Sequence, residues 1–425
     1  MTILLLLGVL LLALAGAPLF AVIAAAALAG FWIADIPLVV VTLEIYRIAD
    51  TPLLLSLPLF AYAGYLLAAG RASERLVTVT RALIGWMPAG LALVAFVVCA
   101  LFTAFTGASG VTIVALGALL FPALVSEGYA ERFSLGLVTS AGSLGLLLVP
   151  SVPLILYGVI AQQLELGISF TLRDLFVAGV LPALLMIGLL SAWALRHVRG
   201  RGMTLTPFSA GELRRALWAA RWDLPLPVFV LGGIYGGLFA VSEMAAVTAL
   251  YVTVSQVLLY RDVPLRRLPG VMVDAMVMVG GILLILAVAL AFTNVLVDAR
   301  IPQRLFEFAS TWITNRLAFL LLLNLTLLLL GAILDIFSAL VIMVPLLLPV
   351  AVGYDIHPVH FGIIFLANMQ IGYFTPPIGM NLFIASYRFG RSVTELYRAS
   401  LPFMLVLLVA LALITYVPWL SLGLL

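Results

Sequence analysis

The segment MQIGYFTPPIGMN, residues 369–381, places two adjacent prolines inside an otherwise apolar stretch. Proline has no amide hydrogen and its ring clashes with the preceding turn, so Pro376 and Pro377 predict a break in a helix. We expect the carbonyls of Gly372 and Tyr373 to lose their helical donors there. An unpaired carbonyl is costly in hydrocarbon, so such a break is expected to be buried in protein or to face water.

The composition of the chain around this break is that of a membrane protein. Of its 425 residues, 65% are apolar and 9% are charged, whereas soluble domains are roughly 45–50% apolar. Many segments approach the ~20 apolar residues that a spanning helix needs, without the short alternating segments of a membrane β-barrel. We therefore expect an all-α polytopic, multi-pass membrane protein. A net charge of +3 gives no reason to expect nucleic acid as a partner.

Arginine supplies all 21 basic residues, and its distribution predicts the topology, because basic loops remain cytoplasmic. The loops expected inside the cell are 71–81, 196–223, 260–267 and 387–398. Counting crossings between them gives two units of opposite orientation.

Each unit is expected to contain a re-entrant hairpin followed by one crossing. Residues 88–125 form the first hairpin and residues 134–160 the crossing. Residues 317–350 and 361–386 repeat the pattern in the other direction. Such inverted repeats with broken helices are typical of secondary transporters.

The two units also resemble each other in sequence. Each has small residues at the hairpin tip, an apolar arm, a Gly-Tyr turn and then a crossing interrupted by proline, in GLLLVPSVPLI and in GYFTPPIGMNL. In the first unit, Pro150 and Pro153 would leave the carbonyls of Leu146 and Val149 without donors. Proline kinks and small residues also occur for packing alone, but matched breaks in inverted units favour a functional role.

A desolvated sodium ion suits such carbonyls, because unwound helix ends supply oxygen ligands to cations in transporters. We expect each hairpin tip to meet its own broken helix and to form one cation site there. The expected ligands are Ser109, Gly145 and Pro150 at the first site, and Thr375 with Asp335 or Ser338 at the second.

Amide hydrogens at the start of each second half-helix favour anions. Ser151 and residues 379–381 are therefore candidates for holding a carboxylate, and the Asn381 side chain adds two donors and one acceptor. The residues assigned to the substrate are Thr106, Ser151, Pro376, Gly379 and Asn381. We expect no organic cofactor and no catalytic residue.

Four motifs resemble the DctM-like large membrane subunit of tripartite ATP-independent periplasmic (TRAP) transporters: TGASGVTIVALGALLFP, TSAGSLGLLLVPSVPLILYG, LGGIYGGLFAVSEMAAV and IGYFTPPIGMNLF. Their order and spacing fit over essentially the whole chain. The resemblance implies an elevator-type transporter of the ion-transporter superfamily, in which sodium bound near the hairpin tips drives the uptake of organic acids. It also implies a place in the bacterial inner membrane and two partners, a small four-helix membrane subunit and a periplasmic substrate-binding protein.

Carried over to matching positions, the resemblance adds Gly107 to the first cation site and supports the residues already assigned to both. Gly110 stands where family members often carry a second hydroxyl, so the resemblance does not fix the number of ions.

The expected plan divides the chain into five parts. They are scaffold helices at 1–87, the first repeat at 88–160, scaffold or arm helices at 161–269, the second repeat at 270–399 and a C-terminal helix at 400–425.

Three other functions are alternatives to this one. A self-sufficient carboxylate transporter would share the plan but need no binding protein. An intramembrane enzyme is disfavoured, because Ser109 has no histidine or lysine near it in sequence to activate it. A channel is disfavoured, because matched inverted units favour alternating access.

Overall fold

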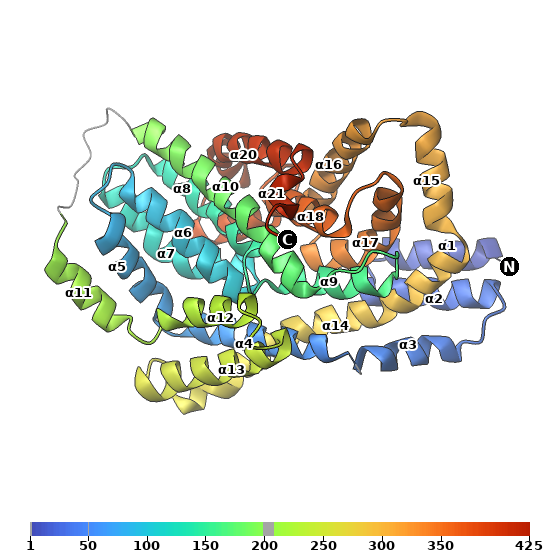
Figure 1. The fold of residues 1–425 in the computed structure, drawn as a ribbon, viewed down its shortest axis with the longest axis horizontal. Helices are drawn as coiled ribbons and strands as arrows, with labels where there is room; N and C mark the ends of the chain where they lie inside the picture. The colour runs from blue at the N-terminus through green and yellow to red at the C-terminus, as the bar shows by residue number, and fades with distance from the viewer. Residues whose placement is uncertain (1, 50, 199–207) are drawn as a thin grey trace.

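The computed structural model describes residues 2–49, 51–198 and 208–425, so part of the expected loop at 196–223 lies outside the described residues. Within these ranges the chain is helical and contains no strand (Figure 1), which confirms the all-α prediction. Seven of the described helices are long and apolar enough to span a membrane, or up to nine if each bent pair is one span. The protein is therefore a multi-pass membrane protein.

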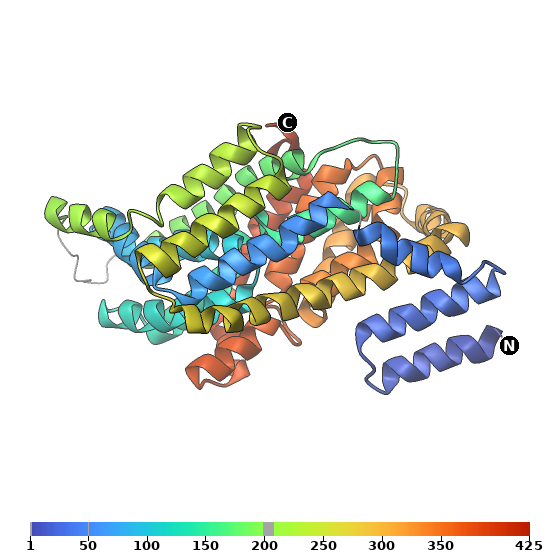
Figure 2. The ribbon, with the colours of Figure 1, turned by 90° about the horizontal axis from the view of Figure 1, so that it is seen from below.

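The N-terminal helices lie along the longest helix of the structure, α14 (Leu268–Asp298). α2 and α4 contact it most, and α1 pairs with α2 at the N-terminal end (Figure 2). This part contains α1 (Thr2–Leu14), α2 (Leu19–Ile33), α3 (Val39–Ala49), η1 (Pro52–Leu55), α4 (Ser56–Ala69) and α5 (Ala72–Ile84).

The first predicted unit is present as a hairpin followed by a broken helix. Its arms are α6 (Gly90–Thr106) and α7 (Ser109–Ser126). The broken helix consists of α8 (Glu131–Ala141), η2 (Leu144–Leu147) and α9 (Val152–Gln163), with a bend of 42° at the break.

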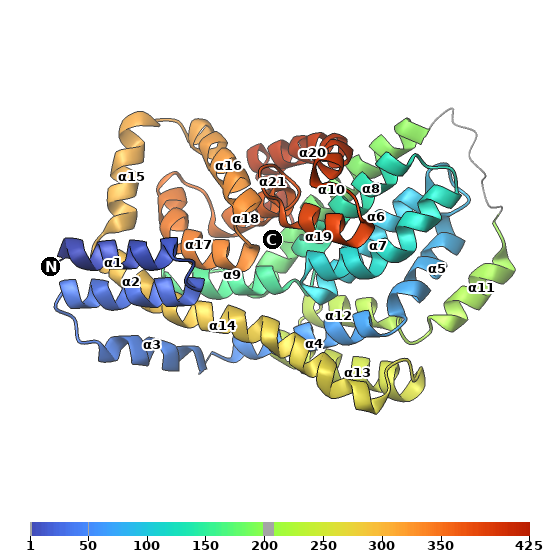
Figure 3. The same cartoon turned by 180° about the vertical axis from the view of Figure 1, so that it is seen from behind.

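The second unit repeats this arrangement. Its hairpin arms are α16 (Arg316–Ile333) and α17 (Ile336–Gly353), and its broken helix consists of α18 (Pro358–Gly372) and α19 (Met380–Phe389). Figure 3 shows the two hairpins running toward the middle of the molecule from opposite ends of its long axis. This agrees with two units of opposite orientation.

The remaining helices connect and surround the two units. α15 lies across the direction of α14 in Figure 1, at one end of the molecule. These elements are α10 (Leu172–Val198), α11 (Ala210–Ala219), α12 (Pro225–Tyr235), α13 (Val241–Thr253), η3 (Val254–Leu259), η4 (Leu265–Arg267), α15 (Ile301–Trp312), α20 (Val393–Tyr416) and α21 (Trp419–Leu422).

Each hairpin packs against both units. The first arms pack on the broken helix of their own unit, α6 on η2 and α16 on α18. The second arms pack on the second half-helix of the other unit, α7 on α19 and α17 on α9. Each hairpin therefore packs on its own broken helix, as expected, and also on the broken helix of the other unit, which was not predicted.

A buried charge cluster fastens α5 to the segment around η3. Arg75 donates through Nε to Asp223, through Nη1 to Asp262 at 2.6 Å and through Nη2 to Gln256 at 3.1 Å. The Tyr260 ring stacks on the guanidinium, 3.7 Å from its centre. Burial raises the pKa of the Asp223 carboxyl, and the hydrogen bond from Arg75 opposes that rise.

The Arg75 cluster predicts a strong effect on stability. Arg75→Gln leaves two carboxylates without their counter-charge, and breaking a buried ion pair on one side destabilises by about 3–5 kcal/mol. We expect a clearly lower thermal unfolding temperature in detergent, followed by tryptophan fluorescence. The control is Arg71→Gln, whose side chain is 74% exposed. Equal unfolding temperatures for the two variants would contradict the role of the cluster.

Close packing at Gly145 gives a second prediction. A Cβ there would lie 2.0 Å from the carbonyl oxygen of Ala100 and 2.5 Å from the amide nitrogen of Ala104, both backbone atoms of α6. Since overpacking costs ~1–3 kcal/mol, we expect Gly145→Ala to lower the unfolding temperature. Gly280→Ala is the control, because nothing lies within 4 Å of a Cβ there.

Candidate functional site

The first break is buried and closed by a side chain. Ser151 is fully buried. Its hydroxyl accepts from the Leu154 amide, which caps α9, and donates to the Leu146 carbonyl. The Val149–Pro150 peptide bond just before it is cis. The prediction that Leu146 lacks a donor is therefore wrong, because the serine that follows Pro150 reaches back to it.

The second break is partly exposed, and backbone amides close it. The Tyr373 carbonyl accepts from the Asn381 amide at 2.9 Å, and the Gly372 carbonyl accepts from the Thr375 amide at 2.9 Å. The prediction that both carbonyls lack donors is wrong, because the loop turns back on itself. Pro376 is exposed, and the bond between it and Pro377 is cis.

The first hairpin turns at Gly107 and joins both breaks. Gly107 has a φ of +65°, which glycine adopts without strain, and a Cβ there would lie 2.8 Å from Val152, the first residue after the first break. The Ser109 hydroxyl donates to Oδ1 of Asn381 at 2.8 Å, which links the tip to the second break. Thr106, also predicted, lies at the same tip and its hydroxyl stays near the Ala108 backbone.

The second hairpin turns at an aspartate cap. Asp335 accepts from the amides of Phe337 and Ser338, each at 3.0 Å, and also from the Ser338 hydroxyl. The Tyr373 hydroxyl of the second break accepts from the Ile336 amide at 2.8 Å. This tip therefore lies on its own broken helix, where it was expected.

The backbones of the second hairpin and the second break touch. A Cβ on Gly372 would lie 2.6 Å from Gly331 on α16. Gly379, with a φ of +59°, donates its amide hydrogen to the Ala332 carbonyl at 2.9 Å. Thr375 lies in the same loop, where its hydroxyl donates to the Ile371 carbonyl at 2.8 Å. The predicted residue Gly379 is thus held in place by the hairpin, whereas Thr375 is held by its own helix.

One donor in this region has no partner. Asn381 is fully buried. Its Oδ1 accepts from Ser109, whereas its Nδ2 group finds no acceptor among the described residues. A buried donor without an acceptor destabilises by ~1–3 kcal/mol. An oxygen of a bound acid would remove that cost.

Several polar side chains near the breaks were not predicted. Thr103 lies 2.7 Å from the Thr112 hydroxyl and donates to the Gly142 carbonyl at 2.8 Å, so three oxygens meet beneath the first tip. Asn368 and Gln370 are fully buried on α18, and each keeps a side-chain oxygen without a donor among the described residues. The signal available in the sequence was a polar side chain inside an apolar span.

Most of the oxygens at the site are uncharged, as expected for a hard cation rather than for a transition metal. Among the described residues, no group of three or more His, Cys, Asp or Glu side chains could hold a metal ion. The oxygens that do gather belong to hydroxyls, carbonyls and the single carboxylate of Asp335. Hydroxyls and carbonyls suit a weakly bound hard cation.

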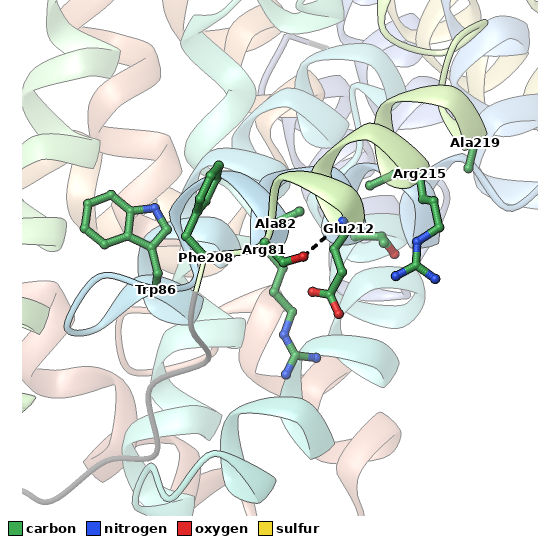
Figure 4. Close-up of a pocket in the computed structure, with 10 residues that line it drawn as sticks. Arg81, Ala82, Trp86, Phe208, Glu212, Arg215 and Ala219 are labelled. Atoms are coloured by element: carbon green, nitrogen blue, oxygen red, sulfur yellow. Dashed lines mark hydrogen bonds between the residues drawn. The ribbon is translucent and has the colours of Figure 1, made fainter.

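A separate cavity of about 560 Å³ lies between α5 and α11. Figure 4 shows Trp86 and Phe208 at one end of it and Arg215 at the other, with Arg81 and Glu212 between them. Arg81 is also paired with Glu127 at 2.7 Å. None of the residues predicted for cation or substrate binding lines this cavity.

Comparison with known proteins extends over nearly the whole chain. Residues 3–420 match the family described as "Tripartite ATP-independent periplasmic transporter, DctM component". The C4-dicarboxylate TRAP transporter large permease protein DctM of Rhodobacter capsulatus is 35% identical over 93% of this chain and 91% of its own. The isethionate TRAP transporter permease protein DctMQ of Oleidesulfovibrio alaskensis is 33% identical over 86% of this chain, which spans 57% of that longer protein.

Two further matches extend the range of relatives. The sialic acid TRAP transporter large permease protein SiaM of Vibrio cholerae is 31% identical over 87% of this chain and 85% of its own. The crystal structure of the YdaH transporter of Alcanivorax borkumensis has the same fold, with a TM-score of 0.64 at 16% identity over 90% of this chain and 88% of that one. The chain belongs to the DctM family, the family of large membrane components of tripartite ATP-independent periplasmic transporters.

Proposed function

We propose that this chain is the permease of a system in which a sodium gradient drives the uptake of an organic acid anion. The observation that carries the proposal is the side-chain amide of Asn381. It is buried between a hairpin tip and a broken helix, is fixed through Oδ1 by Ser109, and offers Nδ2 to an acceptor that the described residues do not supply. An acid oxygen is such an acceptor.

The names of the relatives support an acid as the substrate. They include transporters of C4-dicarboxylates, isethionate and sialic acid. These compounds differ in size, but each carries a carboxylate or sulfonate group whose oxygens accept hydrogen bonds. Ser151, at the start of the other second half-helix, and Thr106, Pro376 and Gly379, near the tips, are the other residues proposed to bind the substrate.

Sodium is proposed to bind as a co-substrate at the two tips. The residues proposed for the first ion are Gly107, Ser109, Gly145 and Pro150, and those for the second are Asp335, Ser338 and Thr375. Although the carbonyls of Leu146, Gly372 and Tyr373 have donors, a carbonyl oxygen has two lone pairs and can also bind a cation. A cation near Ser109 would attract an anion held by Asn381, which couples the two gradients.

Two partners are proposed, a small four-helix membrane subunit and a periplasmic substrate-binding protein. The tripartite description of the family supports them. The packing of each hairpin on both units supports an elevator mechanism, in which the hairpins and broken helices move as one body against the scaffold.

The experiment is reconstitution of the chain, with and without these partners, in proteoliposomes. Succinate, isethionate and N-acetylneuraminate are offered under an inward sodium gradient and, separately, with potassium replacing sodium. Saturable uptake of at least one acid that requires sodium is expected. Uptake without the binding protein would identify a self-sufficient transporter, and equal uptake in potassium would remove sodium from the mechanism.

Two hydroxyl deletions test the cation sites. Thr375→Ala and Ser109→Ala each remove one oxygen, and loss of one such contact, ~1 kcal/mol, should raise the sodium concentration for half-maximal uptake by roughly fivefold. The matched controls are Thr311→Ala on α15 and Ser126→Ala at the far end of α7, whose hydroxyls donate to backbone carbonyls of their own helices. An unchanged sodium dependence for Thr375→Ala would count against the second ion.

A charge substitution tests the anion site. Asn381→Asp replaces the free donor with a negative charge, so the acid loses a hydrogen bond worth ~1.5–3 kcal/mol and is repelled as well. We expect KM for the transported acid to rise at least about tenfold. Asn315→Asp is the control, because Asn315 caps α16 through Oδ1, a role that aspartate also fills. If both variants keep the wild-type KM, the anion is not bound at Asn381.

A further inference from the structure

A second cavity of about 560 Å³ lies beside the candidate site. α4 and α14 form one side of it, and α7 and α19 form the other. Its inner end lies next to the site, because Gly110 follows Ser109 and Ile384 lies one turn after Asn381. The cavity therefore begins where the Ser109–Asn381 hydrogen bond joins the two units.

The two charged residues that line this cavity lie at the start of α14, with Arg267 at its N-cap. Arg267, Gly270, Val271 and Asp274 all line the cavity. Their spacing of three, four and seven residues places them on the same face at the start of the helix. Arg267 and Asp274 are about 10 Å apart along the axis at 1.5 Å per residue. The ion pairs among the described residues are made by Arg71, Arg75, Arg81 and Arg391, and none of them includes Arg267 or Asp274. The other lining residues are apolar or glycine, apart from Tyr65.

The arginine lies nearer the end of α14 that is expected at the cytoplasm. It belongs to the basic turn at residues 261–267, and basic loops remain cytoplasmic. From there α14 runs along the molecule to Asp298 at the other end (Figure 1). An anion that moves from the candidate site to the cytoplasm through this cavity would pass Asp274 before Arg267.

We propose that the acid leaves through this cavity, and that Asp274 and Arg267, both at the start of α14, control its release. Asp274 repels the anion and so weakens its hold at Asn381 once sodium has left. Arg267 attracts it toward the cytoplasmic end. The negative charge destabilises the anion at the candidate site and the positive charge stabilises it nearer the cytoplasm, so together they lower the free-energy cost of release. This inference rests on the proposed function, since it concerns the same substrate.

The charges are tested in the reconstituted complex with succinate as the first probe, followed by the other acids of the panel. Asp274→Asn should lower the maximal uptake rate about tenfold and strengthen equilibrium binding of the acid about tenfold, because the anion is released more slowly. Asp274→Glu should restore both values. Arg267→Gln should lower the rate about threefold without strengthening binding. The control is Asp298→Asn, the same change at the other end of α14, which should behave as the wild type.

The path itself is tested by cysteine accessibility. The single cysteine, Cys99, is buried, so Cys99→Ala gives a background without thiols. Val111→Cys in the cavity should react with a membrane-impermeant maleimide from the cytoplasmic side, and more slowly when acid and sodium are present. Ser126→Cys, outside the cavity, should react at the same rate in both conditions.

The outcomes separate this inference from the proposed function. If the wild type takes up none of the acids, the proposed function fails. If the wild type shows sodium-dependent uptake but Asp274→Asn matches Asp298→Asn, or Val111→Cys reacts only from the periplasmic side, the exit path is wrong and the proposed function stands.

Discussion

The structure depends on one requirement, that main-chain groups released by a break in a membrane helix must find new partners. Both breaks meet it with groups close at hand. The Ser151 hydroxyl donates to the Leu146 carbonyl, and the main-chain amide of Asn381 donates to the Tyr373 carbonyl. The breaks are therefore held in shape before any ligand binds. Ligand binding can use the second lone pairs of the carbonyls and the side chains around them, without ordering the backbone first.

The same requirement places Ser109 and Asn381, two of the residues proposed to bind ligands, at the meeting point of both units. The second break is tied to the second hairpin by Gly379 and Tyr373, and to the first hairpin by the bond between Ser109 and Asn381. An oxygen-rich tip suited to a cation thus lies beside an amide donor suited to an anion. Because unlike charges attract strongly where water is scarce, this neighbourhood supports coupled binding of sodium and an acid.

Much of the architecture could be predicted from the sequence, because its signals are local. Composition indicates the membrane, the arginines indicate which loops stay inside, and Pro150, Pro376 and Pro377 mark the two breaks. The partners of the released carbonyls could not be predicted, because they depend on how each loop folds back. The contact between Ser109 and Asn381 joins residues 272 positions apart, and no local pattern specifies such a pair. Nor did the sequence show that Gln370 would be buried with an unpaired oxygen.

The packing of each hairpin's second arm on the other unit has a consequence for the order in which the chain can fold. α7 packs on α19 and α17 packs on α9, so each unit supplies half of the surroundings of the other. An isolated unit would leave the second arm of its hairpin without the half-helix on which it packs. The packing of α7 can therefore be completed only after α19, near the C-terminal end of the chain, has been synthesised and inserted.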